Sequence, residues 1–343
     1  MLSGMPLWIV AAIFAAAGVA VVLAGVRITG LADRIADKTG LGEALVGGVV
    51  LGATTSLSGI VVSATAALDG RASLAFANGV GGIAAQTAFL ALADVIHRRT
   101  NLEHASADIT NIFQCGLLLV MLSLPLAAFA TPGITVLAVH PVSIVLIAVY
   151  LLGLRATARV KDEPMWKPVR TPETRDDTPD EEPDRGRGLL TLVLRLAGLA
   201  AVLGVAGFAL AKTGGRLSDE LGISETAVGA LMTAVVTSMP ELVTTLVAVR
   251  SGALQLAVGG IIGGNSFDVL FLSLSDIFYR EGSLYHAIGR GDLFWLTVGL
   301  TMSGILLLGL VMRERRGPGN IGFESVSVLG LYAGAVGLQV MLG

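Results

Sequence analysis

Hydrophobic residues make up 54% of the 343 residues and charged residues only 14%, and the mean hydropathy is +0.78. These values exclude an ordinary soluble domain, in which about 25% of residues are charged. The net charge of −3 and the lack of a basic patch give no basis for binding nucleic acid. The composition therefore predicts an all-α integral membrane protein whose surroundings are the lipid bilayer.

Ten apolar runs follow one another along the chain, each long enough for a membrane-spanning helix of about 20 residues. Transmembrane strands would instead appear as alternating segments of about 10 residues, and the sequence shows none. We therefore predict ten transmembrane helices. They lie near residues 6–25, 42–68, 72–94, 108–130, 134–154, 188–211, 226–249, 252–278, 292–312 and 321–342.

A long polar segment, residues 156–187, separates the fifth run from the sixth. It contains five prolines and several acids, a composition that cannot bury a core. The segment divides the chain into a first half, residues 1–155, and a second half, residues 188–343, with five predicted helices in each. Because five is an odd number, the second half enters the membrane in the opposite direction, which predicts two inverted five-helix repeats with a site between them.

The two halves share sequence features at a constant offset of 182 positions. Thr55-Ser56 in the first copy corresponds to Thr237-Ser238 in the second. The glycines at positions 70, 81 and 82 recur at positions 252, 263 and 264. The copies differ in charge, because Glu241 in the second copy corresponds to Gly59 in the first.

Lysine and arginine residues lie mostly in loops on one side of the predicted helices. If the N-terminus is outside, the basic groups near Arg27, Arg98 and Arg313 and those of residues 155–187 are all inside. The positive-inside rule then predicts that both termini are outside and that the central linker is cytoplasmic. Short loops and the lack of an organelle-type transit segment favour the cell (plasma) membrane.

Two acids, Glu241 and Asp268, are predicted to lie well inside helical spans. A charge at that depth costs at least about 2.5 kcal/mol and normally faces a cavity. The sequence places no lysine or arginine at the same depth, so we expect a cation as the partner, or a proton when the cation is absent. The alternative is a pair of structural acids that are hydrogen-bonded inside a packed bundle.

Pro240 is expected to interrupt the helix that carries Glu241, because proline lacks a backbone donor. The interruption would free the carbonyls from Ala234 to Thr237, beside the hydroxyls of Thr237 and Ser238. Ligand sets made of oxygen alone suit hard cations such as Na⁺ and Ca²⁺. By contrast, we expect the loop that carries His97, Glu103, His104 and Asp108 to be solvated surface and not a metal site.

At these residues the chain resembles the sodium/calcium exchanger family of the calcium/cation antiporter superfamily. The resemblance implies inorganic cations (Na⁺, Ca²⁺ or H⁺) as transported substrates, no cofactor, and cation ligands at Glu241, Asp268, Thr237, Ser238 and Ala234, with Thr55, Ser56 and Gln86 from the first copy. The residues of the second copy that match the family motif in register are Thr237, Ser238, Pro240, Glu241, Thr245, Gly259, Gly263, Asn265 and Asp268.

The first copy departs from the family pattern at two ligand positions. Gly59 replaces the ligating glutamate, and Gln86 stands where the family has an asparagine or aspartate. Because Coulomb energy scales with the product of the charges, the loss of an anion weakens the attraction for a divalent cation more than for a monovalent one. Exchange with altered stoichiometry and cation/proton antiport are therefore alternatives to Na⁺/Ca²⁺ exchange.

The sequence thus leads to one main hypothesis of function and two others. The main hypothesis is a secondary antiporter that moves Ca²⁺ or another inorganic cation against Na⁺ or H⁺ by alternating access. The degenerate first copy leaves open a transport-dead protein of the same fold that binds ions or a partner, and the same fold could carry another substrate. An enzyme is not expected, because the sequence shows no nucleophile beside a base and no phosphate-binding loop.

Overall fold

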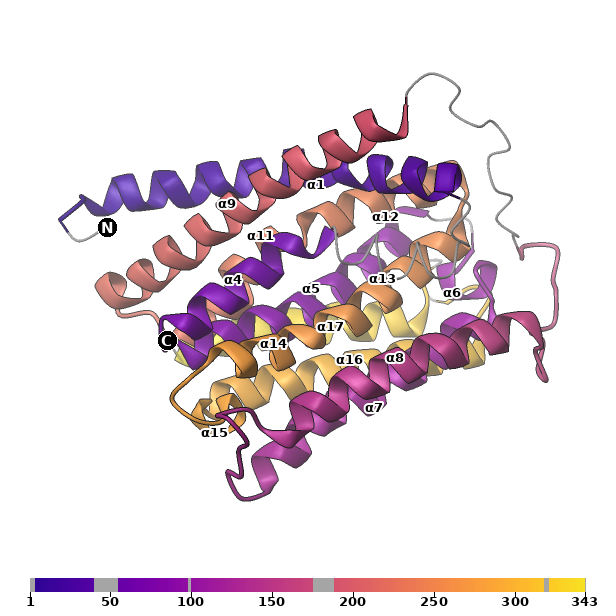
Figure 1. Ribbon diagram of the computed structural model, residues 1–343. Helices are drawn as coiled ribbons and strands as arrows, with labels where there is room; N and C mark the ends of the chain where they lie inside the picture. Colours follow the sequence, from indigo (N-terminus) through magenta and orange to yellow (C-terminus); the bar gives the residue numbers. More distant parts are fainter. Residues whose placement is uncertain (1–3, 40–54, 98–99, 175–187, 318–320, 343) are drawn as a thin grey trace.

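The computed structural model describes residues 4–39, 55–97, 100–174, 188–317 and 321–342 (Figure 1). These residues form a bundle of long helices, and an isolated bridge between Val136 and Val139 is the β pairing found among them. The all-helical architecture predicted from the hydropathy pattern is confirmed.

The described part of the first half of the chain contains six helices. The start predicted for the fifth span, near residue 134, is wrong: that helix begins at Pro141, because the His140 side chain caps its first turn and residues 136–139 form a tight turn. The helices are α1 (Leu7–Thr39), α4 (Leu57–Leu68), α5 (Ala72–His97), α6 (Leu102–Ala105), α7 (Ile109–Ala130) and α8 (Pro141–Asp162).

The second half begins with a long helix and continues through several broken ones. One short stretch, η2, is a π-helix, a form that occurs mostly as single turns inside α-helices and often at functional sites. The elements are α9 (Leu189–Leu221), α10 (Glu225–Ala227), η2 (Val228–Thr233), α11 (Ala234–Thr237), α12 (Met239–Ser251), α13 (Leu254–Asp268), α14 (Leu270–Phe278), α15 (Leu284–Ala287), α16 (Arg290–Met312) and α17 (Phe323–Leu342).

Nine of the ten predicted spans have a counterpart among the described residues. Eight helices, with α13 and α14 counted as one, are long and apolar enough to cross a membrane, and the bent pair formed by residues 225–237 and 239–251 makes a ninth. The remaining prediction, residues 42–68, lies partly outside the described residues. Its described part is the short apolar helix α4.

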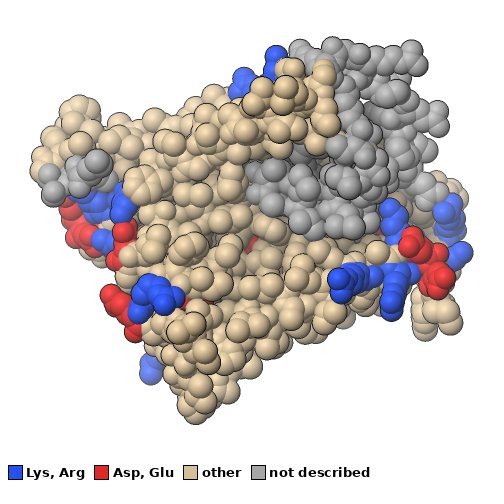
Figure 2. All heavy atoms as spheres, viewed as in Figure 1, with Lys and Arg blue, Asp and Glu red and all other residues tan. Residues whose placement is uncertain are grey.

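On the face shown, most charges gather at the two ends of the molecule, and the surface between them is largely apolar (Figure 2). Large side chains on the outer helices are exposed, among them Leu194 and Val205 of α9. Helix α5 is the opposite case: most of its side chains are buried, and it contacts α4, α13, α16, α17 and η2. The bundle is thus built around α5, and its outer surface suits lipid.

The corresponding helices α4 and α12 run in opposite directions. At the C-terminal end of α4, Asp69 pairs with Lys212 at 2.7 Å. Two residues further on, Arg71 pairs with Glu225 at 2.8 Å, at the start of the path that leads through α10 and α11 into α12. Since α4 ends on the face where the path to α12 begins, the two copies are inverted, as the odd number of helices per half predicts.

Glycines set the close contact between α5 and η2. A Cβ atom added at Gly81 would lie 2.5 Å from the Cα atom of Ala230, and one added at Gly229 would lie 2.7 Å from the Cβ atom of Ala77. Small residues at such crossings let helix backbones approach where lipid supplies no hydrophobic drive. The contact joins the first half of the chain to the second.

We expect Gly81→Ala to destabilise the protein by about 1–3 kcal/mol, the usual cost of overpacking, because the added methyl group meets backbone. Thermal unfolding of the purified protein in detergent measures the loss. Gly116→Ala on α7 is the matched control, since an added Cβ atom there has no neighbour within 4 Å. Equal melting temperatures for the two variants would contradict the close α5–η2 packing.

Candidate functional site

Two helices begin at a serine inside the bundle, at corresponding positions of the two copies. Ser56 precedes α4 with φ −82° and ψ 2°, and Ser238 precedes α12 with φ −93° and ψ 0°. Pro240 lies in the first turn of α12, and the helix axis bends by 44° at this break. The interruption predicted from Pro240 is therefore confirmed, and the two serines have the same local geometry.

The carbonyl group of Ala234 is hydrogen-bonded at this break. It accepts the Ser238 N–H at 3.0 Å and the Thr237 hydroxyl at 3.2 Å. Both lone pairs of the carbonyl oxygen are thus engaged. Pro240 lacks the N–H group that would bond the Val236 carbonyl, four residues earlier, so the Ala234 carbonyl keeps its helical partner. A ligand role for Ala234 stays a prediction, and it requires one of these bonds to open.

Asp268 and Gln86 join the two copies at the centre of the bundle. They occupy corresponding positions, and the Gln86 Nε2 atom donates to the Asp268 Oδ2 atom at 2.6 Å. The two serines at the helix breaks repeat this symmetry: Ser56 donates to Asp268 Oδ1 at 2.7 Å, and Gln86 Nε2 donates to Ser238 Oγ at 3.3 Å. The four predicted site residues therefore meet where the inverted copies cross.

Glu241 lies in the first turn of α12 beside this cluster, with 7% of its surface exposed. Its carboxylate is near Asp268 and the Thr55 side chain. Neither carboxylate oxygen has a hydrogen bond of normal geometry to any described residue, and the same is true of Gln86 Oε1. Buried acceptors without donors are costly, and a bound cation is one way to satisfy all of them.

The ion pairs between described residues lie away from this cluster. They join basic groups to acids near the ends of the bundle, and none of them includes Glu241 or Asp268. A described lysine or arginine therefore does not neutralise the central carboxylates. The pairs are Arg71 with Asp219 and Glu225, Lys212 with Asp69, Arg216 with Glu220, Arg315 with Glu173 and, when the histidine is protonated, His104 with Glu173.

A phenyl ring occupies the place where a first-copy counterpart of Glu241 would extend. A Cβ atom added at Gly59 would lie 2.7 Å from Cε2 of Phe271, and Phe271 itself is buried. Gly82, by contrast, leaves room for no more than a methyl group beside Asp268, because an added Cβ atom would lie in ordinary contact with Asp268 Oδ2 at 3.6 Å. The site is thus asymmetric, with both carboxylates supplied by the second copy.

Two groups of polar residues were not predicted as part of a site, although Asn265 matches the family motif. Asn265 donates to Thr87 Oγ1 at 3.0 Å, while its own Oδ1 atom has no described partner. The expectation that Glu103 and His104 lie on solvated surface is wrong, because α6 folds against the bundle and buries both side chains. Sequence spacing could not reveal this, since α6 is short and its partners come from distant segments.

A bundle of apolar helices, built from two inverted copies with buried carboxylates at their crossing, defines a membrane transporter of the inverted-repeat class. A model of the family described as sodium/calcium exchanger protein matches residues 9–157 and 191–341, one match in each half. The chain therefore belongs to the sodium/calcium exchanger family, which is a family of transporters and not of enzymes.

Similar proteins agree with this assignment. The sodium/calcium exchanger MaX1 of Methanosarcina acetivorans is 36% identical over 124 residues, which is 36% of this chain and 33% of that protein. The crystal structure of the H⁺/Ca²⁺ exchanger CAX superimposes with a TM-score of 0.69 at 12% identity, over 97% of this chain and 86% of that one. The sodium-calcium exchanger NCX_Mj superimposes with a TM-score of 0.60 at 18% identity, over 97% and 99%. The solved structures show the fold.

Proposed function

We propose that the protein is a secondary antiporter that moves a divalent inorganic cation, with Ca²⁺ as the first candidate, against H⁺ or Na⁺. The cation would bind between the two copies and be exposed to one side of the membrane at a time. The proposed ligands are the carboxylates of Glu241 and Asp268, the hydroxyls of Thr237, Ser238, Thr55 and Ser56, the amide oxygen of Gln86 and the carbonyl of Ala234.

The observation that carries this proposal is the Glu241 carboxylate, which is buried beside Asp268 and the Thr55 side chain with no hydrogen bond of normal geometry on either oxygen. Two carboxylates balance the charge of one divalent ion. When the ion leaves, the same two charges need compensation inside the bilayer, where an unpaired charge is costly. Two protons or two Na⁺ ions provide it, so competition for the same carboxylates would couple the two fluxes.

One feature favours protons as the coupling ion. Phe271 fills the volume next to Gly59, so the first copy supplies neither a carboxylate nor room for additional ions there. Each Na⁺ ion needs its own set of oxygen ligands, whereas a proton needs one carboxylate oxygen. We therefore expect the H⁺ gradient to drive exchange more effectively than the Na⁺ gradient.

Flux measurements in liposomes test the proposed function. We expect the purified full-length protein to accumulate ⁴⁵Ca²⁺ when an H⁺ or Na⁺ gradient is imposed, with each gradient varied singly and protein-free liposomes as the control. Uptake should stop when the driving gradient is collapsed by an ionophore. Calcium binding without flux would contradict antiport and support the transport-dead alternative, and neither binding nor flux of any cation would support transport of another substrate.

We further propose that the protein lies in the plasma membrane with both termini outside and the polar segment 156–187 in the cytoplasm. Arg313 and Arg315 at the end of α16 support this orientation, since they contact Val169 and Glu173 of that segment at the same end of the bundle. The division at residues 155 and 188 stays a prediction, and α8 continues to Asp162, inside the predicted linker.

A further inference from the structure

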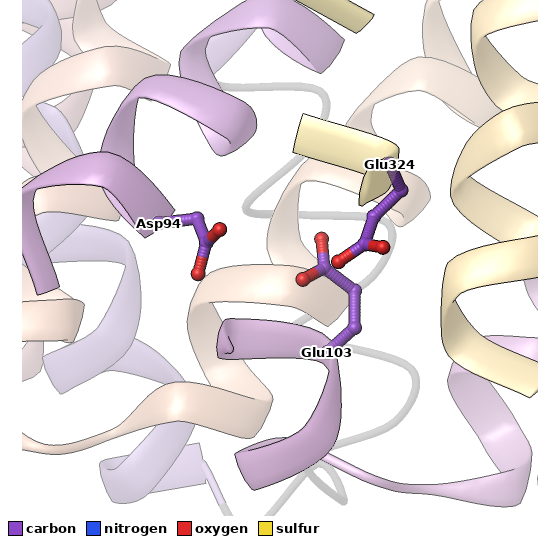
Figure 3. A group of neighbouring side chains, drawn as sticks. All are labelled: Asp94, Glu103 and Glu324. Carbon is purple, nitrogen blue, oxygen red and sulfur yellow. The ribbon is translucent and has the colours of Figure 1, made fainter. Parts of the chain in front are cut away.

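Three acidic side chains meet in the bundle (Figure 3), and none of them belongs to the Glu241–Asp268 site. Asp94 comes from α5, Glu103 from α6 and Glu324 from α17, so both halves of the chain contribute. All three are buried, with 0% or 1% of their surface exposed. Three carboxylates so deeply buried repel one another strongly unless one of them is protonated or a cation joins them.

The spacing of these carboxylates fits one metal ion. One oxygen from each residue lies within 4.8 Å of the corresponding oxygens of the other two. Calcium binds oxygen at about 2.3–2.6 Å, so two ligands on opposite sides of the same ion are about 5 Å apart. The carboxylate of Glu103 lies between the other two (Figure 3), and the three oxygens are close enough to share a single ion.

The carboxyl groups of Glu103 and Glu324 are close enough to share a proton, and two oxygen atoms of the cluster have no donor among the other described residues. They are Oε2 of Glu103 and Oε2 of Glu324, both on side chains that are 1% exposed. The rest of the cluster is fixed by its surroundings: Asp94 accepts the N–H groups of Leu102 at 2.8 Å and Gly322 at 3.3 Å, and Asn101 donates to Glu324 Oε1. The two unpaired atoms thus belong to side chains with little freedom to turn elsewhere.

Among the residues that the structure describes, the other charges near the cluster do not balance it. The guanidinium of Arg313 donates to backbone carbonyls of Val169 and His104, and Arg315 pairs with Glu173. His97 is near Asp94 and supplies at most one positive charge. Burial, and then the neighbouring Asp94 and Glu324, raise the pKa of Glu103 well above its usual range, so that Glu103 holds a proton when no metal ion is bound.

We propose that Asp94, Glu103 and Glu324 form a second cation site, which takes one hard divalent ion such as Ca²⁺ and is separate from the Glu241–Asp268 site. The bound ion would hold α6 and α17 against the end of α5. Because α17 belongs to the second half of the chain and α5 and α6 to the first, the ion would link the two inverted copies where α16 passes into α17.

Equilibrium binding of ⁴⁵Ca²⁺ to the purified full-length protein tests this site without any measurement of transport. We expect two ions per chain in the wild type and one in Glu241→Gln/Asp268→Asn. One ion is also expected in Glu103→Gln/Glu324→Gln, and none when all four residues are changed. The remaining affinity of the Glu241→Gln/Asp268→Asn protein should fall about ten-fold or more on adding Glu103→Gln, since affinity depends on the number of charged ligands.

Glu163→Gln, a change of an exposed acid just after α8, is the matched control and should leave binding unchanged. Thermal unfolding shows whether each variant is folded. Glu103→Gln is nearly isosteric and adds no repulsion between the acids, so the melting temperature of this variant in Ca²⁺-free buffer should not fall. The increase in melting temperature on adding Ca²⁺ should be smaller than in the wild type. The proposal is overturned if Glu241→Gln/Asp268→Asn binds no Ca²⁺, or if changes in the three-acid cluster leave its Ca²⁺ binding intact. If the protein binds Ca²⁺ but does not transport it, the proposed function fails while these binding measurements still test the three-acid cluster.

Discussion

Glu241→Gln is expected to abolish cation exchange, with a fall in flux of at least about 100-fold. The change keeps the shape of the side chain but removes one of the two central carboxylates. Loss of a partner from a buried ionic interaction costs about 3–5 kcal/mol. Since each ten-fold change in affinity corresponds to about 1.4 kcal/mol, this cost weakens cation binding by about 100-fold or more. Flux of ⁴⁵Ca²⁺ into liposomes at a fixed driving gradient measures the effect.

The matched control for this prediction is Glu220→Gln, which removes an acid paired with Arg216 near the end of α9. It should transport at nearly the wild-type rate, because exposed ion pairs contribute little. Glu241→Gln should also melt at or above the wild-type temperature in ion-free buffer, since it removes a buried charge whose oxygens have no hydrogen bond of normal geometry. Flux that survives Glu241→Gln would refute the site assignment.

The second large effect is expected from Gly59→Glu combined with Phe271→Leu. The smaller leucine should make room for the glutamate, which then faces the site from the first copy. At an effective dielectric constant of about 20, a carboxylate at about 6 Å attracts a unit charge by about 3 kcal/mol and a divalent ion by twice that amount. The preference for Ca²⁺ over Na⁺ should therefore increase at least about ten-fold.

Competition between Ca²⁺ and Na⁺ in equilibrium binding measures this change. Phe271→Leu alone should keep the wild-type preference, because it adds no charge. Gly59→Glu alone should lower the melting temperature, because its Cβ atom would lie 2.7 Å from the phenyl ring. A folded double variant with an unchanged ion preference would show that position 59 does not face the ion.

Hydropathy alone located most of the helices but not where they end. The predicted ends near residues 25 and 211 fall short, because α1 continues to Thr39 and α9 to Leu221. Both helices extend beyond their apolar runs, where helix propensity and local packing, which hydropathy does not measure, decide the boundary. The prediction from Pro240 was more accurate, since proline acts on the backbone of its own turn.

The central site was only partly predictable. Glu241 and Asp268 could be selected because a buried carboxylate is rare in an apolar run, and the 182-residue offset placed Gln86 opposite Asp268. The role of Phe271 had no sequence signal, because it lies in α14 and reaches Gly59 only through the packing of α4 against α14. The three-acid cluster had no sequence signal for the same reason, since Asp94 and Glu324 lie at the ends of predicted helices and Glu103 lies in a predicted loop.

The sequence by itself determined the class of protein, the inverted repeat and the acids at its centre, because hydropathy, helix parity and an internal offset are properties of the chain order. Tertiary structure alone decided which groups meet. Ser56 bonds to Asp268 across the bundle, and Asp94, Glu103 and Glu324 come together from three helices. Such contacts join residues far apart in the chain, and their formation depends on how helices cross, which local sequence patterns do not encode.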